Sequence, residues 1–162
     1  MEFSQEIKRE FDQIVARYPQ GRQKSGLLPI LHRVQEEYGW LSTEAMNAVA
    51  GYLQLNPIEV YEVSSFYSMF HLRPVGKYVL EVCRTGPCCL VGAETLLQYL
   101  QRKLNIGIGE TTPDGLFTLK TVECLASCGT GPVLQIGPEY LYHEQLTEQK
   151  LDQLIDSLRS KS

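Results

Sequence analysis

The chain has 162 residues and a formal net charge of −4, with 43% hydrophobic and 21% charged residues. That balance is ordinary for a globular protein, and the absence of a basic stripe argues against a nucleic-acid or anionic-membrane binder. The first residues are charged, which predicts no secretory signal, and no stretch approaches the ~18 apolar residues of a membrane span. The sequence therefore predicts a soluble cytoplasmic protein without membrane insertion.

The first part of the chain, residues 1–74, is predicted to form a small N-terminal helical bundle. Apolar side chains recur at helical spacing over residues 3–18, 26–40, 42–53 and 56–70. The fourth segment has the clearest start, with Asn56 as N-cap, Pro57 at the first helical position and Glu59 completing a capping box. Its aromatic residues are expected mostly in the core, with part available as a partner surface: Tyr61, Phe66, Tyr67 and Phe70.

The pattern changes at Pro74 and Gly76, which predict a boundary and a second domain over residues 75–162. Alternating residues predict a strand over 77–84, followed by an amphipathic helix over 90–107. A turn at 111–115 precedes a strand over 116–124, two short strands over 132–137 and 139–143, and a final helix capped by Thr147. This order is typical of a thioredoxin-like α/β domain, so the predicted fold class of the whole chain is α+β.

All five cysteines fall within a short part of this second domain: Cys83, Cys88, Cys89, Cys124 and Cys128. Structural disulfides are not expected, because the cytoplasmic thiol pool keeps cysteines reduced. The clustering indicates a functional site rather than scattered core residues.

The cysteines lie where two predicted strands end. Cys83 ends the first strand, Cys88 and Cys89 precede a helix, and Cys124 and Cys128 follow the second long strand. If these strands are neighbours in the sheet, both loops leave the same edge and four thiolates can converge. Glycine and proline fill both loops, as close backbone approach to sulfur requires: Gly86, Pro87, Gly129, Gly131 and Pro132.

Three chemistries compete for these cysteines. Structural zinc accepts four thiolates, but its usual pairs are tighter than the C-x4-C and C-x3-C spacings found here. A thioredoxin-type thiol enzyme needs C-x-x-C at a helix start, which the chain lacks, and the vicinal Cys88–Cys89 pair would form a strained disulfide. A [2Fe–2S] cluster tolerates wider pairs, with two thiolates to each iron. Spacing alone favours iron–sulfur, and zinc stays open.

Several longer motifs carry a resemblance to a known family. "VCRTGPCCLVGAE", "TPDGLFTLKTVECLASCGTGPVLQIG", "ILHRVQEEYGWLS" and "VSSFYSMF" resemble NuoE-type subunits of NADH:quinone oxidoreductase (respiratory complex I), members of the thioredoxin-like [2Fe–2S] ferredoxin family. The likeness spans nearly the whole chain, and the spacing of the two cysteine pairs is highly specific. The resemblance implies a thioredoxin-like domain that carries a [2Fe–2S] cluster.

The resemblance also implies a ligand set. The first pair of family ligands falls on Cys83 and Cys88, and the second on Cys124 and Cys128. Cys89 occupies a position that is not a ligand in the family, and a small residue at a helix start is its simplest interpretation. The chain departs from the family pattern at Gly131, where many members have alanine before the proline. Glycine at this position leaves ligation intact but can change the flexibility of the loop or its access to solvent.

The function implied by the resemblance is one-electron transfer. The family's subunit docks on a flavin- and NADH-binding subunit that carries FMN and a [4Fe–4S] cluster, alongside further iron–sulfur subunits in the peripheral arm of a membrane-associated complex. The chain is not expected to bind a dinucleotide, since "GIG" at 107–109 follows a helix and lacks the third glycine of a dinucleotide motif. No catalytic residue is expected on it either.

Two classes of function stay open from the sequence. The first is an electron-transfer subunit of an NADH-oxidising complex, whether the respiratory complex, an NAD-linked hydrogenase or a formate dehydrogenase. The second is a zinc-stabilised interaction module that docks through its helical part. Iron and acid-labile sulfide distinguish the two classes.

Overall fold

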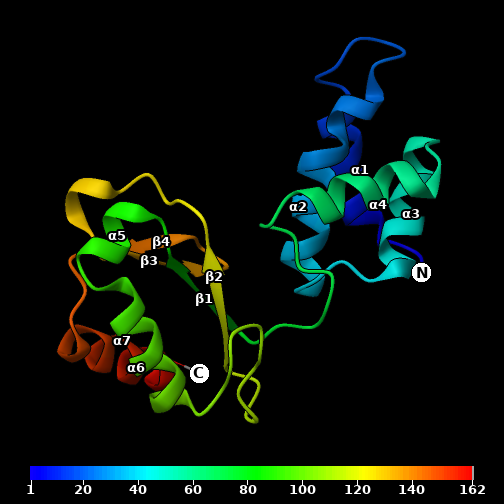
Figure 1. Ribbon diagram of the computed structural model, residues 1–162. Coiled ribbons are helices and arrows are strands. Elements are labelled where there is room, and N and C mark those ends of the chain that lie inside the picture. Colours follow the sequence, from blue (N-terminus) through cyan, green and yellow to red (C-terminus); the bar gives the residue numbers. More distant parts are fainter. Residues whose placement is uncertain (162) are drawn as a thin grey trace. The chain divides into compact units, whose positions relative to one another are not determined.

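The computed structural model describes residues 1–161 and divides into two compact units, Met1–Pro74 and the residues from Val75 onward (Figure 1). The first unit is helical. Its elements are α1 (Gln5–Val15), the short 3-10 turn η1 (Gln23–Gly26), α2 (Leu27–Tyr38), α3 (Thr43–Leu53) and α4 (Pro57–Phe66). Among residues 1–161, no helix combines the length and apolar character needed to cross a membrane.

Polar side chains cap three of the four α-helices of this unit. The Ser4 and Ser42 hydroxyls accept hydrogen bonds from backbone N–H groups in the first turns of α1 and α3. Asn56 and Glu59 form the predicted capping box of α4, with Pro57 in its first turn. Gly39 ends α2 in the left-handed conformation, at φ 78°, where glycine carries no steric penalty. Local capping therefore accounts for where α1, α3 and α4 begin, whereas α2 begins after Gly26 without a side-chain cap.

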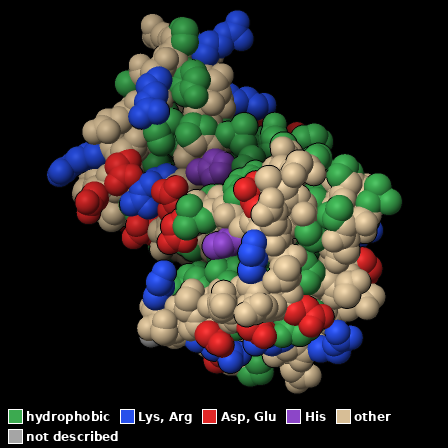
Figure 2. All heavy atoms as spheres, turned by 90° about the vertical axis from the view of Figure 1, so that its left-hand side faces the viewer, with side chains coloured by type: hydrophobic (Ala, Val, Ile, Leu, Met, Phe, Trp, Pro, Cys, Tyr) green, Lys and Arg blue, Asp and Glu red, His purple; other side chains and the backbone are tan. Residues whose placement is uncertain are grey.

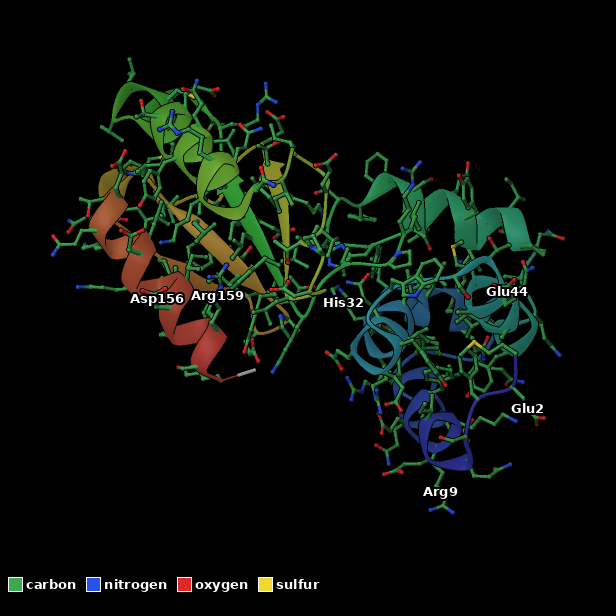
Figure 3. The ribbon with its side chains drawn as sticks, turned by 90° about the horizontal axis from the view of Figure 1, so that it is seen from below. Glu2, Arg9, His32, Glu44, Asp156 and Arg159 are labelled. Carbon is green, nitrogen blue, oxygen red and sulfur yellow. The ribbon has the colours of Figure 1, made fainter. Side chains whose placement is uncertain are left out.

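The helices enclose one apolar core. Phe11 is fully buried and meets the rings of Phe3 and Tyr52 edge-on, with centroids 5.2 and 5.1 Å away. His32 packs its ring 5.0 Å from that of Phe70, while Arg9 points away from the helices (Figure 3). The fully buried side chains at the centre of this core are Phe11, Ile30, Leu31, Val34, Leu41 and Val49.

The expectation that the aromatic residues of the fourth helix lie mostly in the core is wrong for three of the four. Phe70 is buried, but Tyr61 and Tyr67 are substantially exposed and Phe66 is 80% exposed. The physical reason is that α4 ends at Phe66 and the backbone of Tyr67 is extended, so the aromatic residues do not share one helical face. The face of α4 that packs inward carries Val60 instead.

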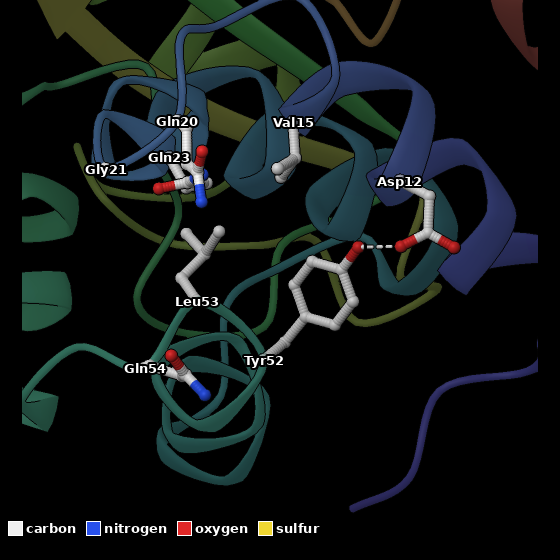
Figure 4. A pocket seen from close by; sticks show the side chains of 8 residues that line it. All are labelled: Asp12, Val15, Gln20, Gly21, Gln23, Tyr52, Leu53 and Gln54. Atoms are coloured by element: carbon white, nitrogen blue, oxygen red, sulfur yellow. Dashed lines mark hydrogen bonds between the residues drawn. The ribbon is translucent and has the colours of Figure 1, made fainter.

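A pocket of about 540 Å³ opens beside α1 and the end of α3 (Figure 4). The Tyr52 hydroxyl donates a hydrogen bond to Asp12 Oδ1 at 2.5 Å across its wall. Burial and this carboxylate raise the pKa of Tyr52, which keeps the hydroxyl protonated as a donor. The remaining lining is made of Val15, Gln20, Gly21, Gln23, Leu53 and Gln54. The lining therefore offers neither a thiol nor an imidazole.

The second unit contains a sheet and three helices. Its elements are β1 (Tyr78–Cys83), α5 (Gly86–Leu90), α6 (Ala93–Leu104), β2 (Phe117–Val122), the 3-10 turn η2 (Cys128–Thr130), β3 (Leu134–Gly137), β4 (Leu141–His143) and α7 (Glu148–Ser160). The strands run in the order β2-β1-β3-β4. The pair β1–β2 is parallel, and the pairs β1–β3 and β3–β4 are antiparallel.

Helices α6 and α7 pack together and share one apolar core with the sheet (Figure 1). Its fully buried members include Leu80, Phe117, Leu119, Leu134, Leu151 and Ile155. Arg159 extends from α7 over the Phe117 ring, with its guanidinium carbon 5.9 Å from the centroid, while Asp156 is exposed on the same helix (Figure 3). Helices followed by a mixed four-stranded sheet confirm the predicted α+β fold class.

Two details of this unit differ from the sequence expectation. The short helix α5 precedes α6, although the sequence predicts a single helix over this region. Strand β1 is buried on both faces rather than on one, and Glu81 in its middle is only 4% exposed. Glu81 lies opposite Lys120 in the parallel register and forms an ion pair with it at 3.3 Å, which compensates the buried carboxylate.

Gly76 occupies a position where the backbone leaves no room for a side chain. A Cβ there would lie 2.9 Å from the carbonyl carbon of Leu116, and the Gly76 N–H donates to Thr118 Oγ1 at 2.6 Å. We expect Gly76→Ala to lower the free energy of unfolding by about 1–3 kcal/mol, measured by denaturant titration. The control is Gly51→Ala inside α3, where nothing lies within 4 Å. That substitution should be neutral or stabilise by about 0.5–1 kcal/mol, and equal effects of the two would contradict the prediction.

Candidate iron–sulfur centre

The parallel pairing of β1 with β2 places the two cysteine loops side by side. Cys83, the last residue of β1, is paired with Val122, the last residue of β2. Because parallel strands end at the same edge of a sheet, the segments that follow Cys83 and Val122 leave this edge together. The condition set by the sequence, that the two strands are neighbours in the sheet, is therefore met.

Cys83 is buried against the loop that carries the second cysteine pair. Its side chain is 2% exposed. The thiol lies 3.3 Å from Thr85 Oγ1 and donates to the carbonyl oxygen of Glu123 at 3.6 Å. Burial opposes ionisation of Cys83, but hydrogen bonds from Thr85 and from the backbone N–H of Leu125 outweigh it and lower the pKa of the thiol. Backbone and hydroxyl donors aimed at sulfur favour a thiolate at this position.

Cys88 lies on α5 beside Cys83 and is also buried. Burial, together with the neighbouring Cys83, raises the pKa of Cys88 to about 11. A hydrogen bond from the backbone N–H of Val133 lowers the pKa of Cys88, and the negative charge of Cys128 raises it. Cys83 and Cys88 therefore form a close pair in which Cys83 ionises first.

The second pair occupies an exposed loop. Cys124 and Cys128 are both exposed, and Cys128 opens the turn η2. Ala126 adopts a left-handed backbone, at φ 56°, and its N–H donates to Cys124 Sγ at 3.3 Å. A non-glycine residue in this region is uncommon, and here it points an amide at a sulfur atom. Such a bond stabilises negative charge on the Cys124 sulfur.

Gly131 provides close approach between the two loops. A Cβ at this position would lie 3.5 Å from Cys88 Sγ and 3.1 Å from a methyl carbon of Val91. The glycine therefore lets the second loop pack directly on a sulfur atom of the first pair. Cys89, in contrast, is exposed, and its thiol donates to the carbonyl oxygen of Arg84 in its own loop at 3.2 Å.

The donor set fits an iron–sulfur cluster in its chemistry. Two buried thiols lie next to a loop with two more, and backbone N–H groups from both loops point at sulfur. Within residues 1–161, no three His, Cys, Asp or Glu side chains gather closely enough to hold one metal ion. The structure places the free thiols of Cys83 and Cys88 next to each other. The assignment of all four cysteines as ligands stays a proposal.

Sequence reasoning missed several polar residues around these loops. The hydroxyl of Thr85 next to Cys83 could be suspected from its place between two cysteines. The carboxylate of Glu144 bonds to Ser127 and Thr130, on either side of Cys128, but it lies far along the chain and no local pattern indicates it.

Surface charges of both signs occur on the face of the protein shown in Figure 2. On the face shown in Figure 2, acidic and basic side chains are interspersed with hydrophobic ones.

The chain is similar in sequence and in fold to several known proteins. The chain is 44% identical over 154 residues to "NADH-quinone oxidoreductase subunit 2" of Thermus thermophilus, covering 94% of this chain and 84% of that protein. It is 42% identical over 154 residues to an NADH-quinone oxidoreductase subunit of Rhizobium meliloti, covering 95% and 89%. The crystal structure of an NAD+-reducing [NiFe]-hydrogenase shares the fold, with a TM-score of 0.73 and 22% identity over 84% of this chain and 23% of that chain.

The match to a family model settles the family. The model of the thioredoxin-like [2Fe–2S] ferredoxin covers residues 11–159, which include most of both units and all five cysteines. The chain belongs to the thioredoxin-like [2Fe–2S] ferredoxin family.

Proposed function

We propose that this chain is the electron-transfer subunit of an NADH-oxidising complex, NADH:quinone oxidoreductase, and that Cys83, Cys88, Cys124 and Cys128 hold its [2Fe–2S] cluster. The family and the names of relatives more than 40% identical support the function. The observation that carries the site is the buried Cys83–Cys88 pair, which is hydrogen-bonded to the loop that bears the second pair.

The residues of this chain have three tasks in the proposed role. When bound, the cluster takes up and returns one electron. Thr85 and the backbone N–H groups of Leu125 and Ala126 stabilise negative charge on sulfur, which favours the more reduced state. Burial of Cys83 and Cys88 excludes water from one side, and the exposed second pair faces outward, where a partner can approach.

The proposed partner is the flavin- and NADH-binding subunit of the same complex, with FMN and a [4Fe–4S] cluster on that subunit and further iron–sulfur subunits beyond it. The relatives are named as subunits of an oxidoreductase complex, which supports association with other subunits. We propose that the chain itself is non-catalytic and that it works on the cytoplasmic side, in the peripheral arm.

The alternatives have less support. The hydrogenase shows the fold alone at 22% identity, whereas the relatives with identities above 40% are named after the quinone-reducing complex. A zinc-stabilised module does not explain the match to a [2Fe–2S] family over residues 11–159.

The first prediction concerns metal content. Protein purified without oxygen should contain about two irons and two acid-labile sulfides per chain, because one [2Fe–2S] cluster needs both. Metal analysis and sulfide determination on the same sample provide the measurement, with zinc quantified alongside as the control. One zinc and no sulfide would contradict the proposal and favour the interaction module.

We also propose that the two compact units are separate domains, residues 1–74 and 75–162. Each unit has its own apolar core, and the division falls after Pro74. A substitution that unfolds one unit should therefore leave the structure of the other in place.

A further inference from the structure

We propose that Glu144 is a positioning residue whose carboxylate holds the loop of Cys124 and Cys128 in the conformation that presents Cys128 as a ligand. The inference rests on the proposed function of Cys128. Glu144 lies in the short segment between β4 and α7, outside both cysteine loops. It does not contact a cysteine and acts through the two hydroxyl residues that flank Cys128.

The carboxylate of Glu144 contacts both hydroxyl residues that flank Cys128; we call this pair of contacts the clamp. Glu144 Oε1 accepts hydrogen bonds from Ser127 Oγ and from Thr130 Oγ1, the latter at 2.6 Å. Ser127 precedes Cys128 directly, and Thr130 follows it by two residues at the end of η2. One oxygen atom therefore connects both ends of the turn that carries Cys128.

The hydroxyl protons of Ser127 and Thr130 are shared between Glu144 and the loop itself. The two hydroxyl oxygens lie 2.6 Å apart, and each carries a single proton. Thr130 Oγ1 also lies 3.2 Å from the carbonyl oxygen of Ser127. One hydroxyl can therefore donate to the other while the second donates to Glu144 Oε1, which acts as the acceptor. The bonds from Ser127 and then Thr130 lower the pKa of Glu144, which is consistent with this geometry.

The backbone beside Glu144 is itself held against the loop. The N–H of Gln145 donates to the carbonyl of Thr130 at 2.7 Å, and the N–H of Leu146 donates to that of Pro132 at 3.1 Å. Leu146 is buried in the core of the unit, so the segment is anchored. Lys150, in the first turn of α7, donates to the carbonyl of Gln145 at 2.9 Å. A fixed segment thus supports the clamp.

The loop has few other restraints. Cys124 and Cys128 are exposed, and Leu125 is the one buried apolar side chain between Glu123 and Cys128. Polar contacts must therefore hold the turn around Cys128, because burial contributes little there. Glu144 supplies the charged acceptor among these contacts, and hydrogen bonds to a charged group are stronger than neutral ones.

The test compares Glu144→Ala and Glu144→Gln with wild type in the full chain. Glu139→Ala is the matched control, because it removes an exposed carboxylate from the turn between β3 and β4. Hydrogen exchange of residues 124–130 in the cluster-free protein measures loop order directly. Iron release to a chelator and the electron paramagnetic resonance spectrum of the reduced protein measure how the loop holds the cluster.

We expect Glu144→Ala to speed hydrogen exchange in this loop and iron release by about three- to tenfold, a modest change because the bonds are solvent-exposed. Its resonance spectrum should also shift. Glu144→Gln retains an oxygen acceptor and should recover most of the wild-type behaviour, and Glu139→Ala should match wild type. Exchange, release and spectrum all unchanged in Glu144→Ala would overturn the inference.

Failure of the proposed function gives a different result. If wild-type protein holds no cluster, the proposed ligand role of Cys128 is wrong. The part of this inference that concerns the cluster is then wrong as well. If wild type holds a normal cluster and Glu144→Ala behaves like Glu139→Ala, only the role of Glu144 is overturned.

Discussion

Replacing Cys83, Cys88, Cys124 or Cys128 by serine is expected to abolish the [2Fe–2S] cluster or change its spectrum strongly, whereas Cys89→Ser leaves it intact. A hydroxyl is a poor substitute for a thiolate on iron, so each ligand variant loses one bond to the cluster. Cys89 is exposed, and its thiol bonds to the backbone carbonyl of Arg84. The visible and resonance spectra of protein purified without oxygen provide the measurement.

Cys89→Ser is the matched control, because it makes the same chemical change one residue from Cys88. The fold of each variant is checked by far-ultraviolet circular dichroism, since Cys83 and Cys88 are also part of a buried cluster of side chains. Loss of the normal cluster in Cys89→Ser, or a normal spectrum in one of the other four, would show that the ligand assignment is wrong.

Phe11→Ala is expected to lower the free energy of unfolding of the helical unit by about 3–5 kcal/mol, the usual range for a buried phenylalanine. The side chain is fully buried, and its ring contacts Phe3 and Tyr52. Removing the ring leaves a cavity at the centre of α1, α2 and α3. Because the second unit also contains helices, denaturant titration is followed by the fluorescence of Trp40, the single tryptophan of the chain, which lies in the helical unit.

The same variant tests the division into two domains. If the units fold separately, Phe11→Ala should retain a normal cluster spectrum at denaturant concentrations that unfold the helices. Leu119→Ala is the matched control in the second unit, where Leu119 is fully buried in the sheet, and it should have the opposite pattern. Simultaneous loss of helices and cluster in both variants would show that the chain unfolds as one domain.

Local chemistry makes much of the fold predictable. Ser42, Asn56 and Thr147 cap their helices as expected, because a cap depends on residues only a few positions away. The order of strands and helices predicts the thioredoxin-like domain, and the neighbouring positions of β1 and β2 follow from it. The five-residue helix α5 escapes such reasoning because so short a segment shows no helical period.

Features that depend on distant parts of the chain cannot be predicted in this way. Phe66 and Tyr67 are exposed because α4 ends at Phe66 and the backbone of Tyr67 is extended. Their hydrophobicity alone would place both side chains in the core. The bond from Ser127 to Glu144 joins residues on opposite sides of the β3–β4 hairpin. The cysteine spacing identifies the candidate ligands, but the burial of Cys83 and the exposure of Cys128 need the structure.

The pairing of Cys83 with Val122 has a consequence for the order of assembly. Helices and the β3–β4 hairpin form from contacts near in sequence, whereas a parallel pair must first close the long crossover between its strands. The unfolded chain keeps its two cysteine loops apart, so a cluster that needs both binds the folded state preferentially. Such binding shifts the folding equilibrium by mass action, and we expect the cluster-loaded chain to resist denaturation better than the same chain without it.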